Sequence, residues 1–538
     1  MVWAPVVHVK ASLSDAFTWT TGRHTVKFGG EYRSVSVDFQ FLGGDSYEFN
    51  SIGDFIDNRP NRVQRVVDSP VFAASQYYLI GYAQDSWRPR HDLSFEFGVR
   101  YEFYSVVREK SGRAKPFFVD DLTFASDPSD FYWPDYDNVG PRLSATWTPW
   151  GAKTVLRGGF GVFYGPGQFE DRIQPIENAI ERYSVGAGDV AGNGLQYPVP
   201  DSVFLSQISV RGYTRSRPDE YNVQFGGSVQ RELPGAVNLN VGYTGSLGRQ
   251  LFLRGVANTY DLVTYQRPIP AIGQVDYKTA GGRASFHSLQ VGATRRFRSG
   301  FTGGFQYMLG RNEGWTQGSN EASTAQNTFD FSSEQGPNAS DIRHTVNASL
   351  VYAFPGRGSL AGGWRVGAIL NARSGVPINV TIARPDFVTV GGVRVMNIPG
   401  GNTRGTQRPD LVAGVDRYLN DGVQWLNPAA FAAPRPGTFG NLGRNALRGP
   451  GFWQVDLMAG KDFPFGGSRA LQIRLDVFNL TNRLNYQQPA AVLPAGTPGV
   501  AFTPETAGAT FGQLLGPLNR TVGLGTARQA QVSVRVQF

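Results

Sequence analysis

The feature of this sequence that most limits its fold is a regular alternation of apolar and polar residues. A period of two puts apolar side chains on one face of a β-strand and polar ones on the other. A tilted strand crosses a bilayer with about 9–11 residues, and the clearest alternating segment, 93–103, has that length. Its apolar positions are Leu93, Phe95, Phe97, Val99, Tyr101 and Phe103, and its polar positions are Ser94, Glu96, Gly98, Arg100 and Glu102.

The amino-acid composition further narrows the class of protein. Charged residues make up 17% of the chain, below the roughly 25% usual for soluble proteins, and no apolar run approaches the roughly 18 residues of a membrane helix. The absence of cysteine excludes a disulfide scaffold and Cys-ligated metal sites. The net charge is +8, but the arginines are scattered and form no stripe, so no nucleic-acid partner is expected.

The spacing of the alternating segments separates a membrane barrel from a soluble β-sandwich. Soluble domains rarely carry many long loops, whereas outer-membrane barrels have short turns at one end and long loops at the other. Short turns are predicted at 88–92, 149–153, 233–236 and 298–300, and long connections at 40–76, 105–139, 165–219, 246–285, 310–342, 374–450 and 483–527.

Aromatic residues lie near the predicted strand ends, as in the two interfacial girdles of a membrane barrel. Expected at the short-turn ends are Trp87, Trp147, Trp150, Phe297, Phe301, Phe354, Trp364, Phe463 and Phe538, and at the long-loop ends Tyr104, Tyr164, Tyr243 and Tyr307.

The strand count predicts that part of a barrel lies upstream. About fifteen strands are expected, and bacterial single-chain barrels have an even number. No secretion signal is visible at the N-terminus, so we expect the chain to be the C-terminal part of a longer precursor. The expected strands are 4–17, 23–39, 76–88, 92–104, 140–148, 153–164, 220–231, 236–245, 286–297, 300–309, 343–353, 363–373, 451–461, 469–480 and 528–538.

Several motifs resemble the β-barrel of TonB-dependent outer-membrane receptors, specifically the Oar-like group. Each motif is short, and their order along the whole chain carries the resemblance. They are the stretches at 22–31 (GRHTVKFGGE), 82–87 (YAQDSW), 98–102 (GVRYE), 141–143 (PRL), 154–161 (TVLRGGFG), 242–246 (GYTGS), 341–344 (DIRH) and 474–482 (RLDVFNLTN).

The resemblance implies an all-β fold: a transmembrane antiparallel barrel of outer-membrane type, with about 15 strands present of the 22 typical of such transporters. It also implies an N-terminal plug domain and a segment that contacts the TonB complex, neither of which is visible here. Phe538 resembles the C-terminal aromatic residue read by the barrel-assembly machinery. The expected function is import of a nutrient or metal chelate across the outer membrane of a Gram-negative bacterium. The alternative is a passive porin or surface adhesin on the same barrel.

A wide barrel encloses a lumen that side chains do not fill, so its inner wall should be polar. These residues would contact the plug and solvate the path of the ligand, or serve only to solvate the lumen. The expected lumen-facing residues are Lys27, Glu31, Glu96, Arg100, Glu102, Arg142, Arg157, Arg365, Arg373, Arg474, Asp476 and Arg535.

The long loops are expected to select a small extracellular ligand. Loop 131–138 contains Asp135 and Asp137 and is interpreted as a site for Ca²⁺, a sugar or an aromatic chelate, or as an ordinary polar loop. Loop 374–450 is interpreted as a lid or as a disordered surface loop.

No enzyme activity, cofactor or metal is expected. The histidines lack the i, i+4 spacing of helical metal ligands, and we expect His344 to hydrogen-bond at the start of a strand. Glycines at 159–165 match no dinucleotide fingerprint, and no nucleophile elbow is present. The histidines are His8, His24, His91, His287 and His344.

Overall fold

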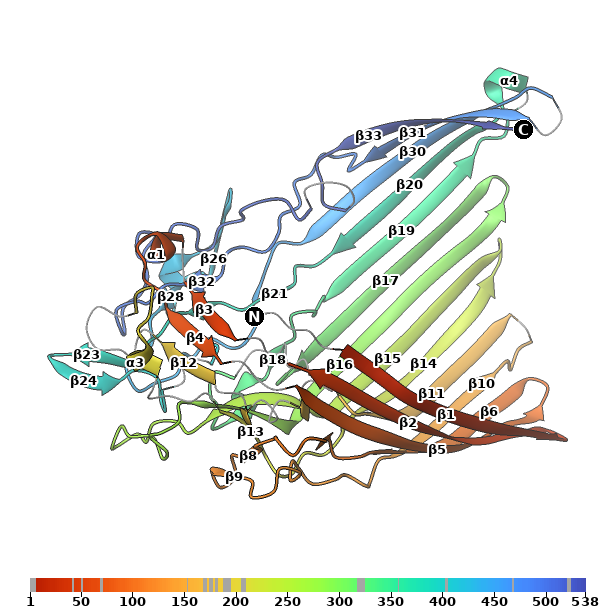
Figure 1. Cartoon of the computed structure of the whole chain (residues 1–538). Coiled ribbons are helices and arrows are strands. Elements are labelled where there is room, and N and C mark those ends of the chain that lie inside the picture. The colour runs from red at the N-terminus through yellow and green to blue at the C-terminus, as the bar shows by residue number, and fades with distance from the viewer. Residues whose placement is uncertain are drawn as a thin grey trace.

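The computed structural model describes residues 6–40, 43–49, 52–67, 71–151, 153–167, 172–173, 178–179, 182–186, 195–204, 210–316, 325–356, 358–401, 405–466, 469–519 and 524–538. Within these ranges, β-strands dominate and the helices are short (Figure 1). None of the helices found there has the length and apolar character to cross a membrane.

Fifteen strands of nine or more residues form one antiparallel meander in the described part of the chain, each paired with the next. The predicted all-β, antiparallel architecture is therefore confirmed. These strands are β1 (Val6–Thr21), β2 (His24–Phe39), β5 (Phe72–Arg90), β6 (Leu93–Tyr104), β10 (Val139–Trp147), β11 (Thr154–Gly165), β14 (Glu220–Leu233), β15 (Val237–Ala257), β16 (Val275–Arg298), β17 (Phe301–Gly314), β19 (His344–Ala353), β20 (Trp364–Arg373), β30 (Phe452–Pro464), β31 (Ala470–Phe478) and β33 (Gln529–Gln537).

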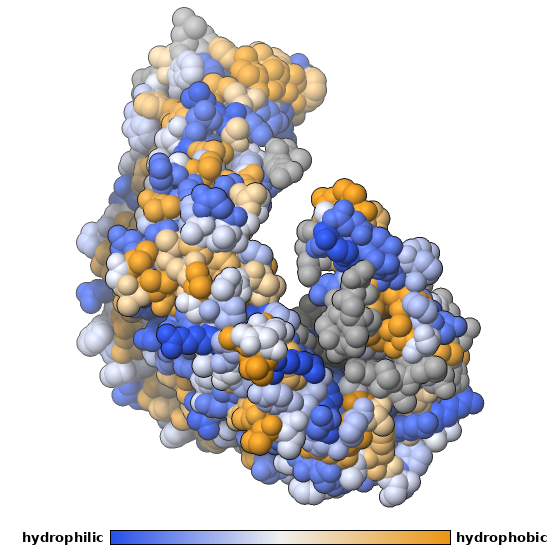
Figure 2. All heavy atoms as spheres, turned by 90° about the vertical axis from the view of Figure 1, so that its left-hand side faces the viewer, coloured by the Kyte–Doolittle hydropathy of each residue, from blue (hydrophilic) through white to orange (hydrophobic). Residues whose placement is uncertain are grey.

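The sheet is curved, and its edge strands among the described residues are β1 and β33. β1 and β33 lie at opposite sides of the sheet (Figure 1), and no pairing joins them among the described residues. Figure 2 shows the resulting C-shaped outline around a central hollow. Both edge strands run from the long-connection end towards the short-turn end, because β1 precedes the tight turn at 22–23 and β33 follows the long connection after β31.

Two strands are much longer than predicted. The expected strands 236–245 and 286–297 extend to 237–257 and 275–298, so the connection between them shrinks to 258–274. The alternation that identifies a strand stops at Leu251, because Leu251, Phe252 and Leu253 are all buried. A strand covered on both faces reads as a continuous apolar run, so its sequence shows no period of two.

The long connections fold into small structures of their own at one end of the sheet (Figure 1). A three-stranded sheet joins β3 and β4 of the first long connection to β12 of the third. The short elements at this end are β3 (Gly44–Glu48), α1 (Ile52–Ile56), β4 (Arg62–Val66), β7 (Arg108–Glu109), β8 (Phe117–Phe118), β9 (Thr123–Phe124), β12 (Arg182–Gly186), α3 (Asp201–Phe204), β13 (Arg211–Tyr213), η3 (Phe331–Glu334), β18 (Gly336–Pro337), β21 (Pro377–Ile378), β22 (Thr381–Ile382), β23 (Phe387–Val390), β24 (Val393–Met396), β25 (Asp410–Leu411), β26 (Tyr418–Asp421), β27 (Gln424–Leu426), η4 (Pro428–Ala430), β28 (Phe431–Ala432), β29 (Leu447–Arg448) and β32 (Val492–Leu493). The short helix α4 (Gly358–Ala361) lies at the opposite end, between β19 and β20 (Figure 1).

Segment 374–450 packs together with the connection after β31. Strands β21 and β29 pair with each other, and β22 pairs in parallel with β32 of the later connection. The two connections share one apolar core, which we call the loop core. Its buried residues are Ile378, Val380, Ile382, Leu426, Ala430, Phe431, Ala433, Leu442, Leu447, Leu493, Phe502, Ala507 and Phe511. The interpretation of 374–450 as a disordered surface loop is therefore wrong.

One of the predicted girdle residues lies on the wrong face. Strand pairing puts Tyr164 and Tyr243 on the face of Phe97, but Tyr104 lies on the opposite face. There the Tyr104 hydroxyl is buried and donates a hydrogen bond to Glu102. Tyr104 stands at the end of its strand, where covering loops bury the polar face.

Candidate functional site

Strand pairing brings the charged residues predicted from the sequence onto one face of the sheet, which we call the polar face. Cross-strand partners in an antiparallel sheet point to the same side, so the face of each residue follows from the register. The opposite, apolar face carries exposed Phe97, Leu143 and Phe160, which pair with one another across β6, β10 and β11. The polar face holds Lys27, Glu31, Glu96, Arg100, Glu102, Arg142, Arg157, Arg365, Arg373, Arg474, Asp476 and Arg535.

Some of these charges are paired along their own strand. Arg100 Nε donates to Glu102 Oε1 at 2.7 Å, and Arg474 donates to Asp476 Oδ1 at 2.7–2.9 Å. Residues two apart on a strand share a face, so such pairs run along the strand direction.

Other charges on the polar face have no such partner. Lys27, Glu96 and Arg142 make no hydrogen bond or ion pair with any residue that the structure describes. The Arg142 guanidinium lies 4.5 Å from the centroid of the Phe163 ring, within the range of a cation–π contact.

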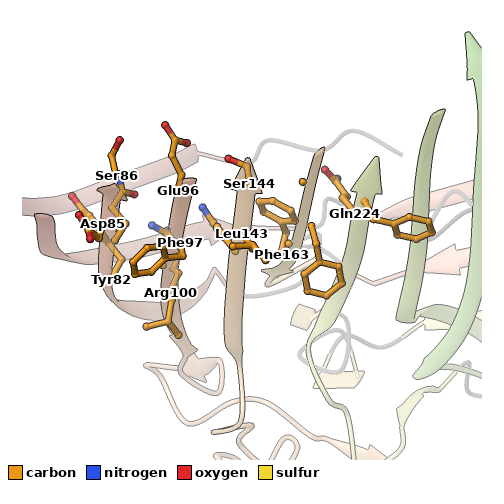
Figure 3. Close-up of a pocket in the computed structure, with 18 of the residues that line it drawn as sticks. Tyr82, Asp85, Ser86, Glu96, Phe97, Arg100, Leu143, Ser144, Phe163 and Gln224 are labelled. Atoms are coloured by element: carbon orange, nitrogen blue, oxygen red, sulfur yellow. The ribbon is translucent and has the colours of Figure 1, made fainter. Parts of the chain in front are cut away.

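These unpaired groups line a cavity of about 720 Å³ in the wall formed by β2, β5, β6, β10, β11, β14 and β15. One cross-strand row through it reads Lys27, Gln84, Gly98, Arg142, Gly161 and Gln224. Glycines in this row and in the neighbouring cross-strand row have no side chain and therefore leave the space above the backbone open. In Figure 3, Ser86, Glu96 and Ser144 lie towards one end of the cavity and Arg100 towards the other.

Gly161 shows how tightly the cavity floor is arranged. A Cβ added there would lie 2.8 Å from the Phe163 ring and 3.5 Å from Cγ of Arg142. Only a residue without a side chain leaves room for that stacked pair. The glycine pattern was visible in the sequence at 158–161, but its role depends on partners from β10 and β14.

The loop above this wall contains a buried ion pair that the sequence did not predict. Asp219 is paired with Arg172, and both are almost fully buried. The Asn138 amide donates to Asp219 at 2.8 Å. Burial raises the pKa of Asp219.

The two acidic residues of loop 131–138 lie close together, and one of them accepts backbone hydrogen bonds. Asp135 accepts backbone N–H groups of Asp137 and Asp219 with its two carboxylate oxygens, and its proximity raises the pKa of Asp137. No group of three or more His, Cys, Asp or Glu residues suited to a metal ion occurs within the described ranges.

The histidines lie apart, and two of them form matching pairs on the apolar face. Tyr243 contacts His287 Nδ1 at 2.7 Å, and Tyr307 contacts His344 Nδ1 at 2.9 Å. His344, at the start of β19, is a hydrogen-bonding group as predicted. The side chain of His8 lies outside the described part of the structure.

A second buried ion pair joins segment 374–450 to the connection between β17 and β19. Arg408 donates from both terminal nitrogens to the Glu334 carboxylate at 2.8 and 3.0 Å, and both side chains are buried. Arg444 donates to the Glu334 carbonyl at 2.8 Å. Sequence reasoning missed this network because its members are far apart along the chain.

A curved antiparallel sheet with an apolar outer face, a charged opposite face, short turns at one end and folded loops at the other defines an outer-membrane β-barrel. The chain belongs to the outer membrane beta barrel domain family, whose model matches residues 7–531. This confirms the predicted location in the outer membrane. A search of curated protein sequences gave no match.

Solved structures of outer-membrane transporters resemble this chain at low sequence identity. The transporter YddB from Escherichia coli is 12% identical, with 90% of this chain and 51% of that chain covered and a TM-score of 0.47. The FrpB iron transporter from Neisseria meningitidis is 12% identical, with coverages of 88% and 50% and a TM-score of 0.44. The siderophore receptor PiuA from Acinetobacter baumannii is 12% identical, with coverages of 98% and 55% and a TM-score of 0.43. This chain spans about half the length of each.

Proposed function

We propose that this chain is the barrel portion of an Oar-like, TonB-dependent receptor that imports a small nutrient or metal chelate. The observation that carries the proposal is the polar face, with charged residues from β2 round to β33. A wall of this kind suits a water-filled path too wide for side chains to fill. The order of the short motifs along the chain supports the Oar-like group.

The directions of the edge strands support further strands between them. β1 and β33 run the same way, so antiparallel closure requires an odd number of strands in between. A second copy of the chain inserted in the same orientation could not close the barrel. Its edge strands would run in the same direction as β1 and β33, whereas antiparallel pairing needs strands of the opposite direction. Because lipid cannot satisfy an open sheet edge, we infer that additional strands of the same polypeptide complete the barrel.

The proposal also assigns partners. An N-terminal plug would occupy the lumen and contact the TonB complex, the apolar face would contact outer-membrane lipid, and the loops would bind a small extracellular ligand. The barrel-assembly machinery would insert the chain, with Phe538, exposed after β33, as its signal. No catalytic role or cofactor is assigned.

The test is the ionic conductance of the full-length protein in planar lipid bilayers. We expect no steady conductance in KCl solution, because a plug fills the lumen. A steady open conductance of the correctly folded protein would instead establish the porin alternative. An adhesin needs neither a plug nor a TonB-contacting segment. The sequence preceding residue 1 in the full polypeptide therefore distinguishes the adhesin alternative from the proposed receptor.

A further inference from the structure

The wall cavity presents two unpaired charges of opposite sign on adjacent strands. Glu96 of β6 lies directly opposite Ser144 of β10, and Arg142 lies two residues along β10. Such diagonal neighbours stand about 7–8 Å apart, which is close enough for long side chains to meet. They do not form an ion pair, because the Arg142 guanidinium is stacked on Phe163.

Each charge has polar groups beside it that suit a ligand. Arg100, diagonal to Arg142 across β6 and β10, uses Nε on Glu102 and keeps two terminal nitrogens. Ser86 and Ser144 are the cross-strand partners of Glu96 on either side. One end of the cavity therefore offers guanidinium donors, and the other end offers a carboxylate with two hydroxyl groups.

We propose that this cavity is a binding site for a zwitterionic ligand of the size of a short peptide. The ligand carboxylate lies between Arg142 and Arg100, and its ammonium group lies against Glu96. The pairing of a planar guanidinium with a carboxylate gives such a site directional strength. The cavity volume of about 720 Å³ accommodates several residues. The inference rests on the proposed function, and it requires that the plug leave this stretch of the polar face open to water and to the ligand.

The test uses the full-length protein in detergent and triglycine as the probe. Phenylglyoxal modifies accessible arginines, and peptide mass spectrometry reads the labelling rate of Arg142 separately from that of Arg157. Arg157 shares the polar face, donates to Gln230 and does not line the cavity. At about ten times the Kd of triglycine, labelling of Arg142 should fall about tenfold, since only the free fraction reacts, while Arg157 is unchanged.

The role of Glu96 is tested by comparing two peptides in the unchanged protein and in Glu96→Gln. N-acetyl-triglycine lacks the ammonium group, and we expect it to protect Arg142 about tenfold less well than triglycine. In Glu96→Gln the two peptides should protect equally. Absence of protection by triglycine, or an undiminished preference for it in Glu96→Gln, would overturn the proposal. Protection in a protein that also conducts as an open pore would overturn the receptor function and leave this site standing.

Discussion

Replacing Leu143 by arginine is expected to prevent most copies of the protein from reaching a folded state in the membrane. Leu143 is the central residue of β10, is exposed on the apolar face and pairs with Phe97 and Phe160. A charge at the middle of the lipid face costs about 2–4 kcal/mol. The folded fraction is measured by the heat-dependent shift in gel mobility and by protease resistance in isolated outer membranes.

The matched control places the same charge one residue further along the strand. Ser144 lies on the polar face, directly opposite the unpaired Glu96, so Ser144→Arg gains an acidic partner in water. We expect it to assemble like the unchanged protein. Gly98 would be a poor control, because a Cβ there would lie 2.7 Å from the Ala83 carbonyl oxygen. Equal loss of folding in Leu143→Arg and Ser144→Arg would contradict the assignment of the two faces.

The sequence predicts the part of the fold that a bilayer constrains. Lipid requires one apolar face and permits a polar one, and this requirement leaves a period of two that is visible in β6 or β33 without knowledge of their partners. The extension of β15 beyond Leu251 is not predictable in this way. It lies among covering loops, where Phe252 and its neighbours are buried on both sides.

The candidate site, like the fold, could be predicted from the sequence only in part. The charges that face the cavity follow from alternation, because Arg142 and Glu96 occupy polar positions in clear strands. The cavity itself does not, because it depends on which strands stand side by side and on the glycines that meet across them. Likewise, Arg408 and Glu334 lie 74 residues apart, and nothing local in the sequence marks them as partners.

The buried Arg408–Glu334 pair leads to the second large expected effect. In Glu334→Gln the Arg408 guanidinium stays buried without a counter-charge, and breaking a buried pair in this way costs about 3–5 kcal/mol. The Gln326 backbone N–H, which donates to Glu334 Oε1 at 3.0 Å, also loses a charged acceptor. Local opening of the loop core should become about a hundredfold or more frequent. Hydrogen exchange of amides near Arg408 and Leu442 measures that change.

Two comparisons show whether the lost charge pair is the cause. Glu313→Gln makes the same chemical change in an exposed pair with Arg311, where the expected cost is about 1 kcal/mol or less. Adding Arg408→Met to Glu334→Gln removes the unpaired charge and should restore much of the protection, because an apolar replacement of a buried pair is often neutral. Fast exchange that persists in the double variant would mean that Glu334 holds the loop core through its other hydrogen bonds. Slow exchange in Glu334→Gln alone would mean that the apolar core holds segment 374–450 in place without the ion pair.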